Sequence, residues 1–142
     1  GLDVIGTGPR SRLLRREARD ADVRFLGWVS REELRAAYRR AAALLVPNVE
    51  DFGMVTVEAL ACGTPVVGLQ ASGTADAVRS GVEGELAGES SVESLADATR
   101  RVLERPWPVE QLRRRAEVFS RDSFLLRLRF LLDRVGFGKV LA

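Results

Sequence analysis

Two hydrophobic patterns alternate along this chain. Short apolar runs closed by Gly or Pro predict strands, and segments with apolar residues three or four positions apart predict helices. The expected strands lie within residues 2–9, 23–28, 43–47, 64–69 and 83–88. The expected helices lie within residues 11–21, 30–41, 53–63, 74–81, 91–105, 109–119 and 122–135, and the third begins between Gly53 and Val55.

This alternation predicts the fold class, an α/β protein with a parallel, Rossmann-like sheet and helices on both faces. Such sheets bind ligands beyond the carboxyl ends of their strands. The loops after the first four strands are therefore expected to line one edge. Their sequences are GTGPR, GWVS, NVEDFG and QASGT.

Two helices carry additional features. Ser30 and Glu33 have the spacing of a capping box at a helix start. The last helix has more apolar residues than one buried stripe needs, and they are Phe124, Leu125, Leu126, Leu128, Phe130, Leu131 and Leu132. This helix is expected to pack either across its own domain or against a surface that the chain lacks.

Composition is that of a globular protein, because 46% of the 142 residues are hydrophobic and 30% are charged. The net charge is only +2, and every basic residue except Lys139 is Arg. The arginine-rich segments PRSRLLRREAR and QLRRRAE are expected to be solvated helix faces, with a surface for phosphate or anionic lipid as the alternative. Nucleic acid is not an expected partner, because aromatic residues are sparse and no recognition motif accompanies the arginines.

Cysteine and histidine usage excludes several chemistries. With one Cys and no His, the chain has no internal disulfide, thiolate metal cluster or imidazole catalyst. Cys62 is expected to be a small buried residue near a helix end. No apolar run reaches the length of a membrane span and the first residues lack a signal pattern. We therefore expect a cytoplasmic protein, with peripheral contact at the inner face of a membrane as an alternative.

The stretch NVEDFGMVTVEALACGTPVV holds two carboxylates, Glu50 and Glu58, and the second lies in an apolar run where burial without a partner would be costly. The predicted strand, loop and helix place unpaired N–H groups at the edge of the sheet, a natural phosphate site. Each carboxylate can accept hydrogen bonds from ligand hydroxyls, Glu58 from a ribose diol and Glu50 from a sugar. The ligand so described is a sugar nucleotide.

A structural explanation of the same residues stays open. Glu50 and Asp51 can form a solvated loop in which Asp51 caps the helix, and Glu58 can pair with an Arg. The spacing alone favours this explanation.

The whole stretch EDFGMVTVEALACGTPVV resembles the signature of retaining glycosyltransferases of the GT-B fold, glycosyltransferase family 4 or group 1 type. The matching positions are Glu50, Phe52, Gly53, Glu58, Ala59, Ala61, Gly63, Pro65, Val66 and Val67. VIGTGP, VRFLGWVSREELRAAYRRAAALLVP and ASGTADAVRSGVEGELA are similar to the flanking family segments. The resemblance covers residues 1 to 104 in order.

The resemblance implies a metal-independent donor site for a nucleoside diphosphate sugar, with no cofactor. Glu50 would contact the donor sugar and stabilise charge at the reacting centre, and Glu58 would hold the ribose. The backbone of Phe52, Gly53, Met54 and Val55 would bind the diphosphate and sugar, and Gly27, Trp28 and Val29 would border the base. The EDFG form resembles mannosyltransferases of cell-surface polysaccharide synthesis, acting on glycan or lipid-linked acceptors.

The chain departs from the family pattern in three places. Ser72 replaces the first Gly of a Gly-Gly pair, and Asp76 replaces the following Glu. The family's N-terminal acceptor domain, and the central strand whose Arg and Lys clamp the diphosphate before Leu2, are absent. Residues 1–142 therefore read as a donor-binding domain, with a C-terminal helix and tail at 120–142, that is expected to be inactive alone and to need an N-terminal domain or another chain.

Other functions remain to be weighed. GTGPRS has Ser11 where a dinucleotide fingerprint needs Gly, which argues against an oxidoreductase. An interaction module with the same fold and no catalysis is the main alternative, because an open sheet and an apolar last helix favour association. An epimerase or phosphorylase with this fold is a third possibility, although Lys139 is the only residue able to hold pyridoxal phosphate.

Overall fold

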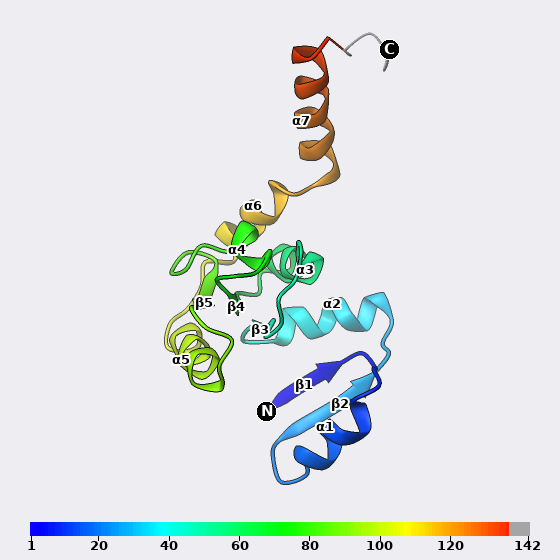
Figure 1. Cartoon of the computed structure of the whole chain (residues 1–142), viewed down its shortest axis with the longest axis vertical. Coiled ribbons are helices and arrows are strands. Elements are labelled where there is room, and N and C mark those ends of the chain that lie inside the picture. The colour runs from blue at the N-terminus through cyan, green and yellow to red at the C-terminus, as the bar shows by residue number, and fades with distance from the viewer. Residues whose placement is uncertain (137–142) are drawn as a thin grey trace. The chain divides into compact units, whose positions relative to one another are not determined.

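The computed structural model describes residues 1–136 and forms two compact units, Gly1–Ala37 and Tyr38–Ala142. Figure 1 shows the helices and strands of both. Within each unit the strands are parallel and accompanied by helices.

The first unit contains two parallel strands. Its elements are β1 (Leu2–Ile5), α1 (Ser11–Glu17), β2 (Val23–Gly27) and the start of α2 (Arg31–Arg40). Leu2 lies opposite Val23, and an ion pair of 2.7 Å joins Arg24 to Asp3 across the ladder. The predicted capping box is confirmed, since Ser30 Oγ accepts from the Glu33 N–H at 3.2 Å and Glu33 accepts from the Ser30 N–H at 2.8 Å. Hydrogen bonding of the Glu33 carboxylate to Ser30, chiefly to the Ser30 N–H, lowers the pKa of Glu33.

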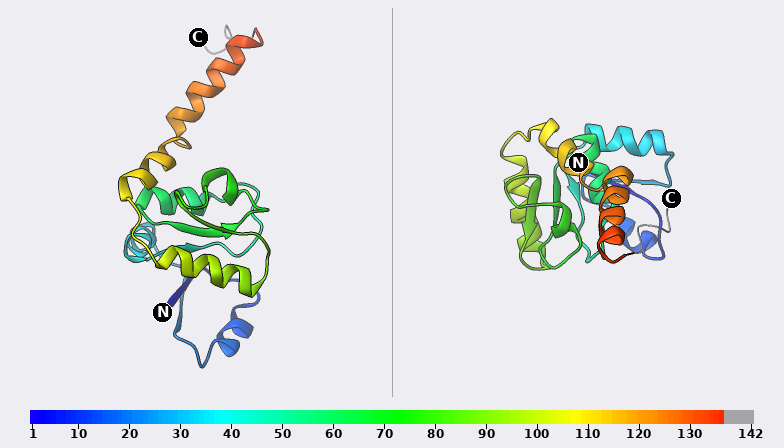
Figure 2. Two further views of the ribbon diagram at one scale, coloured as in Figure 1. Left: turned by 90° about the vertical axis from the view of Figure 1, so that its left-hand side faces the viewer. Right: turned by 90° about the horizontal axis from the view of Figure 1, so that it is seen from above.

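The second unit is a three-layered α/β arrangement around β4. Its elements are the end of α2, β3 (Leu44–Leu45), α3 (Met54–Cys62), β4 (Val66–Leu69), α4 (Thr74–Ala77), β5 (Gly84–Ala87), α5 (Val92–Leu103), α6 (Val109–Glu117) and α7 (Arg121–Arg134). The strand order is β3-β4-β5, all parallel. Figure 2 shows α5 on one face of this sheet and α3 with α4 on the other, as predicted.

All five predicted strands and seven predicted helices form, with two differences in detail. Hydrogen bonds join the strands in two sets, β1–β2 and β3–β4–β5. β1 and β3 each have one edge with which no described strand pairs. The helix expected over 74–81 ends at Ala77, since Val78 is extended and the Val78 N–H already bonds the Thr74 carbonyl.

The core of the second unit surrounds β4, whose four residues are all buried. Val67 and Leu69 face α5 and pack with Ala98 and Val102. On the opposite face Gly68 makes room for α4, because a Cβ there would lie 3.0 Å from the Cβ of Thr74. Close packing on both faces fixes the ends of β3 and β4, from which the candidate site is built.

Helix α7 has no buried residue. Its exposed apolar side chains are Phe124, Leu125, Leu126, Phe130 and Leu131. The expected packing across its own domain is therefore not observed. Within residues 1–136, every helix is too short or too polar to cross a membrane. The tail beyond residue 136, with Lys139, lies outside the described residues.

Candidate functional site

The start of α3 has a buried glycine, Gly53, followed by two exposed residues, Met54 and Val55. Gly53 has a φ of +73°, a left-handed conformation that favours glycine, and starts the helix without a side-chain cap. The Thr56 N–H bonds the Gly53 carbonyl at 2.9 Å, whereas the Met54 and Val55 N–H groups have no acceptor among the described residues. The expectation that Asp51 caps this helix is wrong, since glycine occupies the cap position.

The loops after β3 and β4 bind each other at this helix start. The Gly73 N–H donates to the Glu50 carbonyl at 2.7 Å. A Cβ at Gly73 would lie 2.7 Å from the Cα of Phe52 and closer still to the Asp51 carbonyl, so only glycine fits. The prediction that NVEDFG and QASGT share one edge is confirmed.

Ser72 adds a contact that the usual family glycine lacks. Its hydroxyl accepts the Glu50 N–H at 2.9 Å and lies 3.4 Å from the Glu50 carbonyl. Two hydrogen bonds from adjacent residues, one from Gly73 and one to Ser72, therefore fix the backbone of Glu50.

Replacing Ser72 by alanine is expected to lower the free energy of unfolding by about 1 kcal/mol, because a partly buried hydrogen bond is lost. Urea unfolding followed by Trp107 fluorescence, in a Trp28→Phe background, measures the change. Ser90→Ala is the control, because it removes an exposed hydroxyl from the same unit. Ser80→Ala is less suitable, because Ser80 Oγ accepts a hydrogen bond from the Leu86 N–H. Equal effects of Ser72→Ala and Ser90→Ala would contradict the proposed role of the Ser72 hydroxyl.

Glu58 lies on the exposed side of α3, whereas Thr56, Ala59 and Leu60 of the same helix are buried. The premise that its charge is buried is wrong, and no ion pair with Arg forms within residues 1–136. Its partner is Tyr38, whose hydroxyl donates to Glu58 Oε2 at 3.3 Å. One carboxylate oxygen is thus oriented by the protein and the group stays accessible.

Tyr38 is itself only 8% exposed. Burial is the main cause that raises the pKa of Tyr38, and the negative charge of Glu58 and its hydrogen bond raise it further. A neutral Tyr38 is the form that donates to the carboxylate.

Tyr38 is the only tyrosine of the chain, so absorbance near 295 nm, about where tyrosinate absorbs, follows its ionisation alone. We expect the folded chain to ionise at higher pH than the urea-unfolded chain, which should titrate near about 10. Because the pKa of Tyr38 is raised in the folded state, its ionisation makes the free energy of unfolding depend on pH. The contribution of Tyr38 to stability is complete below the unfolded pKa and falls as pH rises above it. Titration at the unfolded value would contradict the burial of Tyr38.

Glu50 has a partly buried position, and its Oε1 accepts a hydrogen bond from the Asn48 side chain. Phe52, Met54 and Val55 are 43%, 68% and 40% exposed, whereas Gly53 between them is buried. The structure therefore brings Glu50 and Phe52–Val55 together at one helix start, with Glu58 one turn further along α3.

The remaining predicted site residues belong to the first unit. Gly27 ends β2 with a φ of +70°, Trp28 is 82% exposed and Val29 is partly exposed. Their role beside the base stays a prediction. Sequence reasoning missed Tyr38, which bonds Glu58, and Phe119, whose ring contacts that of Phe52, since neither belongs to the quoted stretch. It also gave no role to Asn48, the first residue of that stretch, which bonds Glu50.

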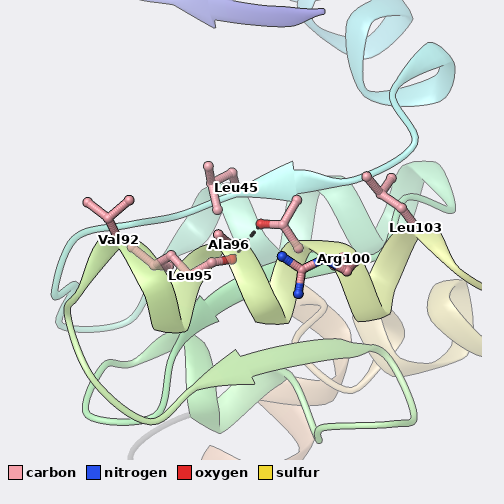
Figure 3. A pocket seen from close by; sticks show the side chains of 7 residues that line it. Leu45, Val92, Leu95, Ala96, Arg100 and Leu103 are labelled. Atoms are coloured by element: carbon pink, nitrogen blue, oxygen red, sulfur yellow. Dashed lines mark hydrogen bonds between the residues drawn. The ribbon is translucent and has the colours of Figure 1, made fainter.

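In the second unit a groove of 520 Å³ runs along α5 and β3, and no predicted site residue lines it (Figure 3). It is lined by Leu45, Val92, Leu95, Ala96, Thr99, Arg100 and Leu103. Apart from Thr99 and Arg100 these side chains are apolar, and Thr99 already donates to the Leu95 carbonyl at 2.7 Å. The groove lacks the converging polar groups that a nucleotide needs.

Comparison with known proteins identifies the family. A family model described as "Glycosyl transferases group 1" matches residues 1–105. This chain belongs to the group 1 glycosyltransferases. The recognised signature, the loops around α3 and the parallel strands all lie within the matched residues.

Three curated relatives illustrate the similarity of this glycosyltransferase chain to named proteins. A D-inositol 3-phosphate glycosyltransferase of Mycolicibacterium smegmatis is 45% identical over 84 residues, which are 58% of this chain and 19% of the relative. The protein of that name from Mycobacterium avium is 40% identical over 105 residues, 73% of this chain and 25% of the relative. A glycogen synthase of Mycobacterium tuberculosis is 36% identical over 120 residues, 81% of this chain and 29% of the relative.

Two solved structures share the fold of this glycosyltransferase chain. Sucrose-phosphate synthase from Thermosynechococcus elongatus aligns with a TM-score of 0.79 and 29% identity, over 94% of this chain and 38% of that one. The lipopolysaccharide outer core galactosyltransferase WaaB aligns with a TM-score of 0.73 and 22% identity, over 84% of this chain and 36% of that one. The predicted fold class, part of a GT-B glycosyltransferase, is confirmed.

The chain spans only 19% to 29% of the length of these curated relatives. That fraction agrees with the prediction that a further domain accompanies the donor-binding part in such proteins.

Proposed function

We propose that this chain is the donor-binding part of a retaining glycosyltransferase. The start of α3 receives the diphosphate of a nucleoside diphosphate sugar, Glu58 accepts hydrogen bonds from the ribose, and Glu50 faces the donor sugar. The observation that carries the proposal is the pair of N–H groups at Met54 and Val55 that have no acceptor within residues 1–136, after a left-handed Gly53 and near the partly buried Glu50 and the exposed Glu58. Family membership supports it.

Each contact has a physical reason. Unpaired N–H groups at a helix start carry partial positive charge and favour phosphate. A carboxylate accepts two hydroxyls of a ribose diol, and such charge-assisted hydrogen bonds contribute about 1.5–3 kcal/mol each. A Glu58 oxygen held by Tyr38 at 3.3 Å starts with less rotamer freedom to lose on binding.

Affinity is expected to be weak and turnover absent. Within residues 1–136 the diphosphate charge is met by a helix start worth about 0.3–1 kcal/mol. Transfer to an acceptor needs reacting groups held in place from both sides, which a second domain would supply. In that complete enzyme Glu50 would stabilise charge that develops at the sugar.

The sugar and acceptor are finer parts of this proposal. The EDFG form suggests mannose transferred to a glycan or lipid-linked acceptor in polysaccharide synthesis. The names of the similar proteins differ, since one is a glycogen synthase and another a sucrose-phosphate synthase. The EDFG motif alone therefore supports this acceptor class. Cytoplasmic location, with peripheral contact at a membrane, stays a prediction.

Calorimetric titration with UDP-glucose and GDP-mannose tests the function. We expect about millimolar dissociation constants for one of the two, unchanged between EDTA and Mg²⁺ because the protein contacts need no metal. The same titrations with glucose and mannose, which lack the nucleotide, are the control. Binding that requires Mg²⁺ would contradict metal independence, and absence of binding at ten times the expected constant would contradict the donor site.

An interaction module without catalysis is the second candidate, and α7 is the observation that favours it. Its exposed Phe124, Leu126 and Phe130 leave an apolar surface without a described partner. Light scattering distinguishes the two candidates. A monomer that binds a nucleotide sugar supports the transferase part, and an oligomer indifferent to both nucleotides supports the module.

A further inference from the structure

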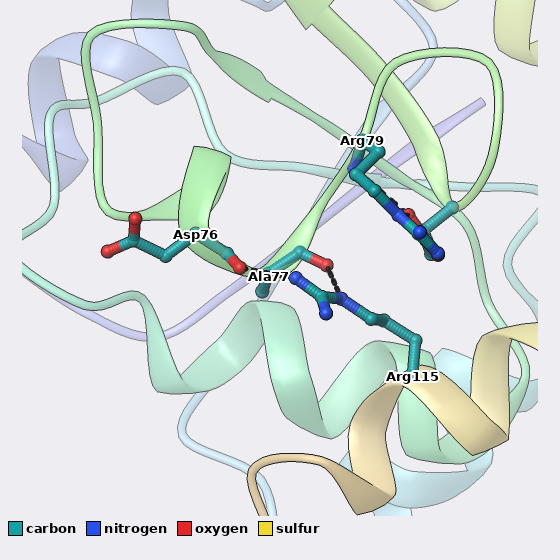
Figure 4. Close-up of polar contacts among 5 residues, drawn as sticks. Asp76, Ala77, Arg79 and Arg115 are labelled. Atoms are coloured by element: carbon teal, nitrogen blue, oxygen red, sulfur yellow. Dashed lines mark hydrogen bonds and ion pairs between the residues drawn. The ribbon is translucent and has the colours of Figure 1, made fainter.

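Helix α6 reaches both loops of the donor site from outside the matched family residues. Its Arg115 donates from Nη2 to the Asp76 carbonyl at 2.6 Å and from Nε to the Ala77 carbonyl at 2.9 Å. Figure 4 shows the guanidinium directed at the backbone of α4, while the Asp76 carboxylate points the other way. These carbonyls are at the end of a four-residue helix, where no further turn supplies donors.

Arg115 is also linked to the loop before α3, through contacts with Phe119 and then Phe52. Its guanidinium lies 5.1 Å from the ring centre of Phe119. The Phe119 ring meets Phe52 edge to face, with ring centres 5.7 Å apart and an interplanar angle of 64°. We call Arg115 and Phe119 the α6 clasp, because together they contact α4 on one side and Phe52 on the other.

The α6 clasp rests on a buried base. Leu112 is fully buried and Ala116 is 6% exposed, and α6 packs against α3. Leu112, Arg115 and Ala116 are spaced as one helix face, and Phe119 lies in the turn that follows α6, where its N–H donates to the Ala116 carbonyl at 2.9 Å. The neighbouring Arg113 instead pairs with Glu110 of its own helix at 2.9 Å. The contact of Arg115 with α4 is therefore specific to its place on the packed face.

The two contacted segments already form the inner wall of the site. The Gly73 N–H bonds the Glu50 carbonyl, and Gly73 lies against the Asp51–Phe52 backbone. The α6 clasp contacts the same two segments at other points. Arg115 binds α4, which follows Gly73, and Phe119 contacts Phe52, which precedes Gly53. Neither clasp residue belongs to the matched residues 1–105.

We propose that Arg115 and Phe119 are positioning residues for the donor-sugar end of the site. They keep Phe52–Gly53 and α4 at the spacing that the diphosphate sugar requires, without touching the ligand. The ribose end at Glu58 is oriented by the hydrogen bond from Tyr38 rather than by either clasp residue. This inference rests on the proposed function, and it predicts that losing the clasp affects the sugar end alone.

The test compares two ligands of one base in calorimetry with the full chain, UDP-glucose with UMP and GDP-mannose with GMP. In Arg115→Ala, affinity for the diphosphate sugar is expected to fall about tenfold while that for the monophosphate changes less than about twofold. Arg115→Lys keeps the positive charge but lacks the planar guanidinium that donates two hydrogen bonds. It is expected to recover part of the lost affinity for the diphosphate sugar. Phe119→Leu, which keeps apolar packing, tests the other half, and Arg113→Ala is the matched control.

Equal affinities of Arg115→Ala and the parent would overturn the proposal, and so would equal losses for both ligands, which indicate general destabilisation. A parent chain that binds neither ligand refutes the donor site itself. Amide hydrogen exchange without ligand then decides about the clasp. Faster exchange of Gly73 in Arg115→Ala, with Leu69 unchanged, would support loop positioning, and unchanged Gly73 exchange would overturn it.

Discussion

Replacing Glu58 by alanine is expected to weaken nucleotide-sugar binding by about 10- to 100-fold. The estimate follows from two ribose hydrogen bonds to a carboxylate, each contributing about 1.5–3 kcal/mol, reduced because the site is exposed to water. Fold stability should change little, since Glu58 is an exposed helix residue whose only described partner is the Tyr38 hydroxyl.

Calorimetry with the better-bound nucleotide sugar measures this loss. Glu104→Ala removes the same charge from an exposed position of the same unit and is the matched control. Glu58→Gln separates shape from charge, because the amide keeps one acceptor but loses the charge assistance. An affinity of Glu58→Ala equal to that of Glu104→Ala would contradict the ribose assignment.

Replacing Gly73 by alanine is expected to remove measurable donor binding and to lower the free energy of unfolding by about 1–3 kcal/mol. The added Cβ would lie 2.7 Å from the Cα of Phe52, a backbone atom that cannot rotate away as a side chain can. The two loops must therefore separate, which breaks the 2.7 Å bond between the Gly73 N–H and the Glu50 carbonyl.

Unfolding in urea is best followed in a Trp28→Phe background, where Trp107 reports on the second unit alone. Gly88→Ala is the control, because a Cβ at Gly88 has no atom within 4 Å and Gly88 belongs to the same unit. If Gly73→Ala unfolds at the same urea concentration as Gly88→Ala and still binds donor, the close approach of the loops is not required.

Hydrophobic periodicity was sufficient to predict the order of strands and helices, because each buried strand and each amphipathic helix leaves its own local pattern. The capping box at Ser30 was equally local and is confirmed. The turn at Gly53 followed from a glycine placed between a strand and a helix, and its positive φ agrees with that expectation.

The contacts around the site were less predictable, because they join residues far apart in the sequence. The apolar run around Glu58 suggested a buried charge, but the buried residues of α3 are its neighbours and Glu58 is exposed. The bond from Tyr38 spans 20 residues, and those of Arg115 to α4 span 38 and 39. Ser72 was a departure from the motif until its hydrogen bonds to Glu50 gave it a role.

The central claim is that the start of α3 binds the diphosphate of a nucleotide sugar. Backbone amide spectra of the ¹⁵N-labelled chain, recorded during titration with UDP-glucose and GDP-mannose, test it most directly. We predict that the largest shifts occur at Gly53, Met54 and Val55, with smaller ones at Glu58. Shifts confined to other segments, such as the α5 groove around Leu95, or no shifts for either ligand, would contradict the account.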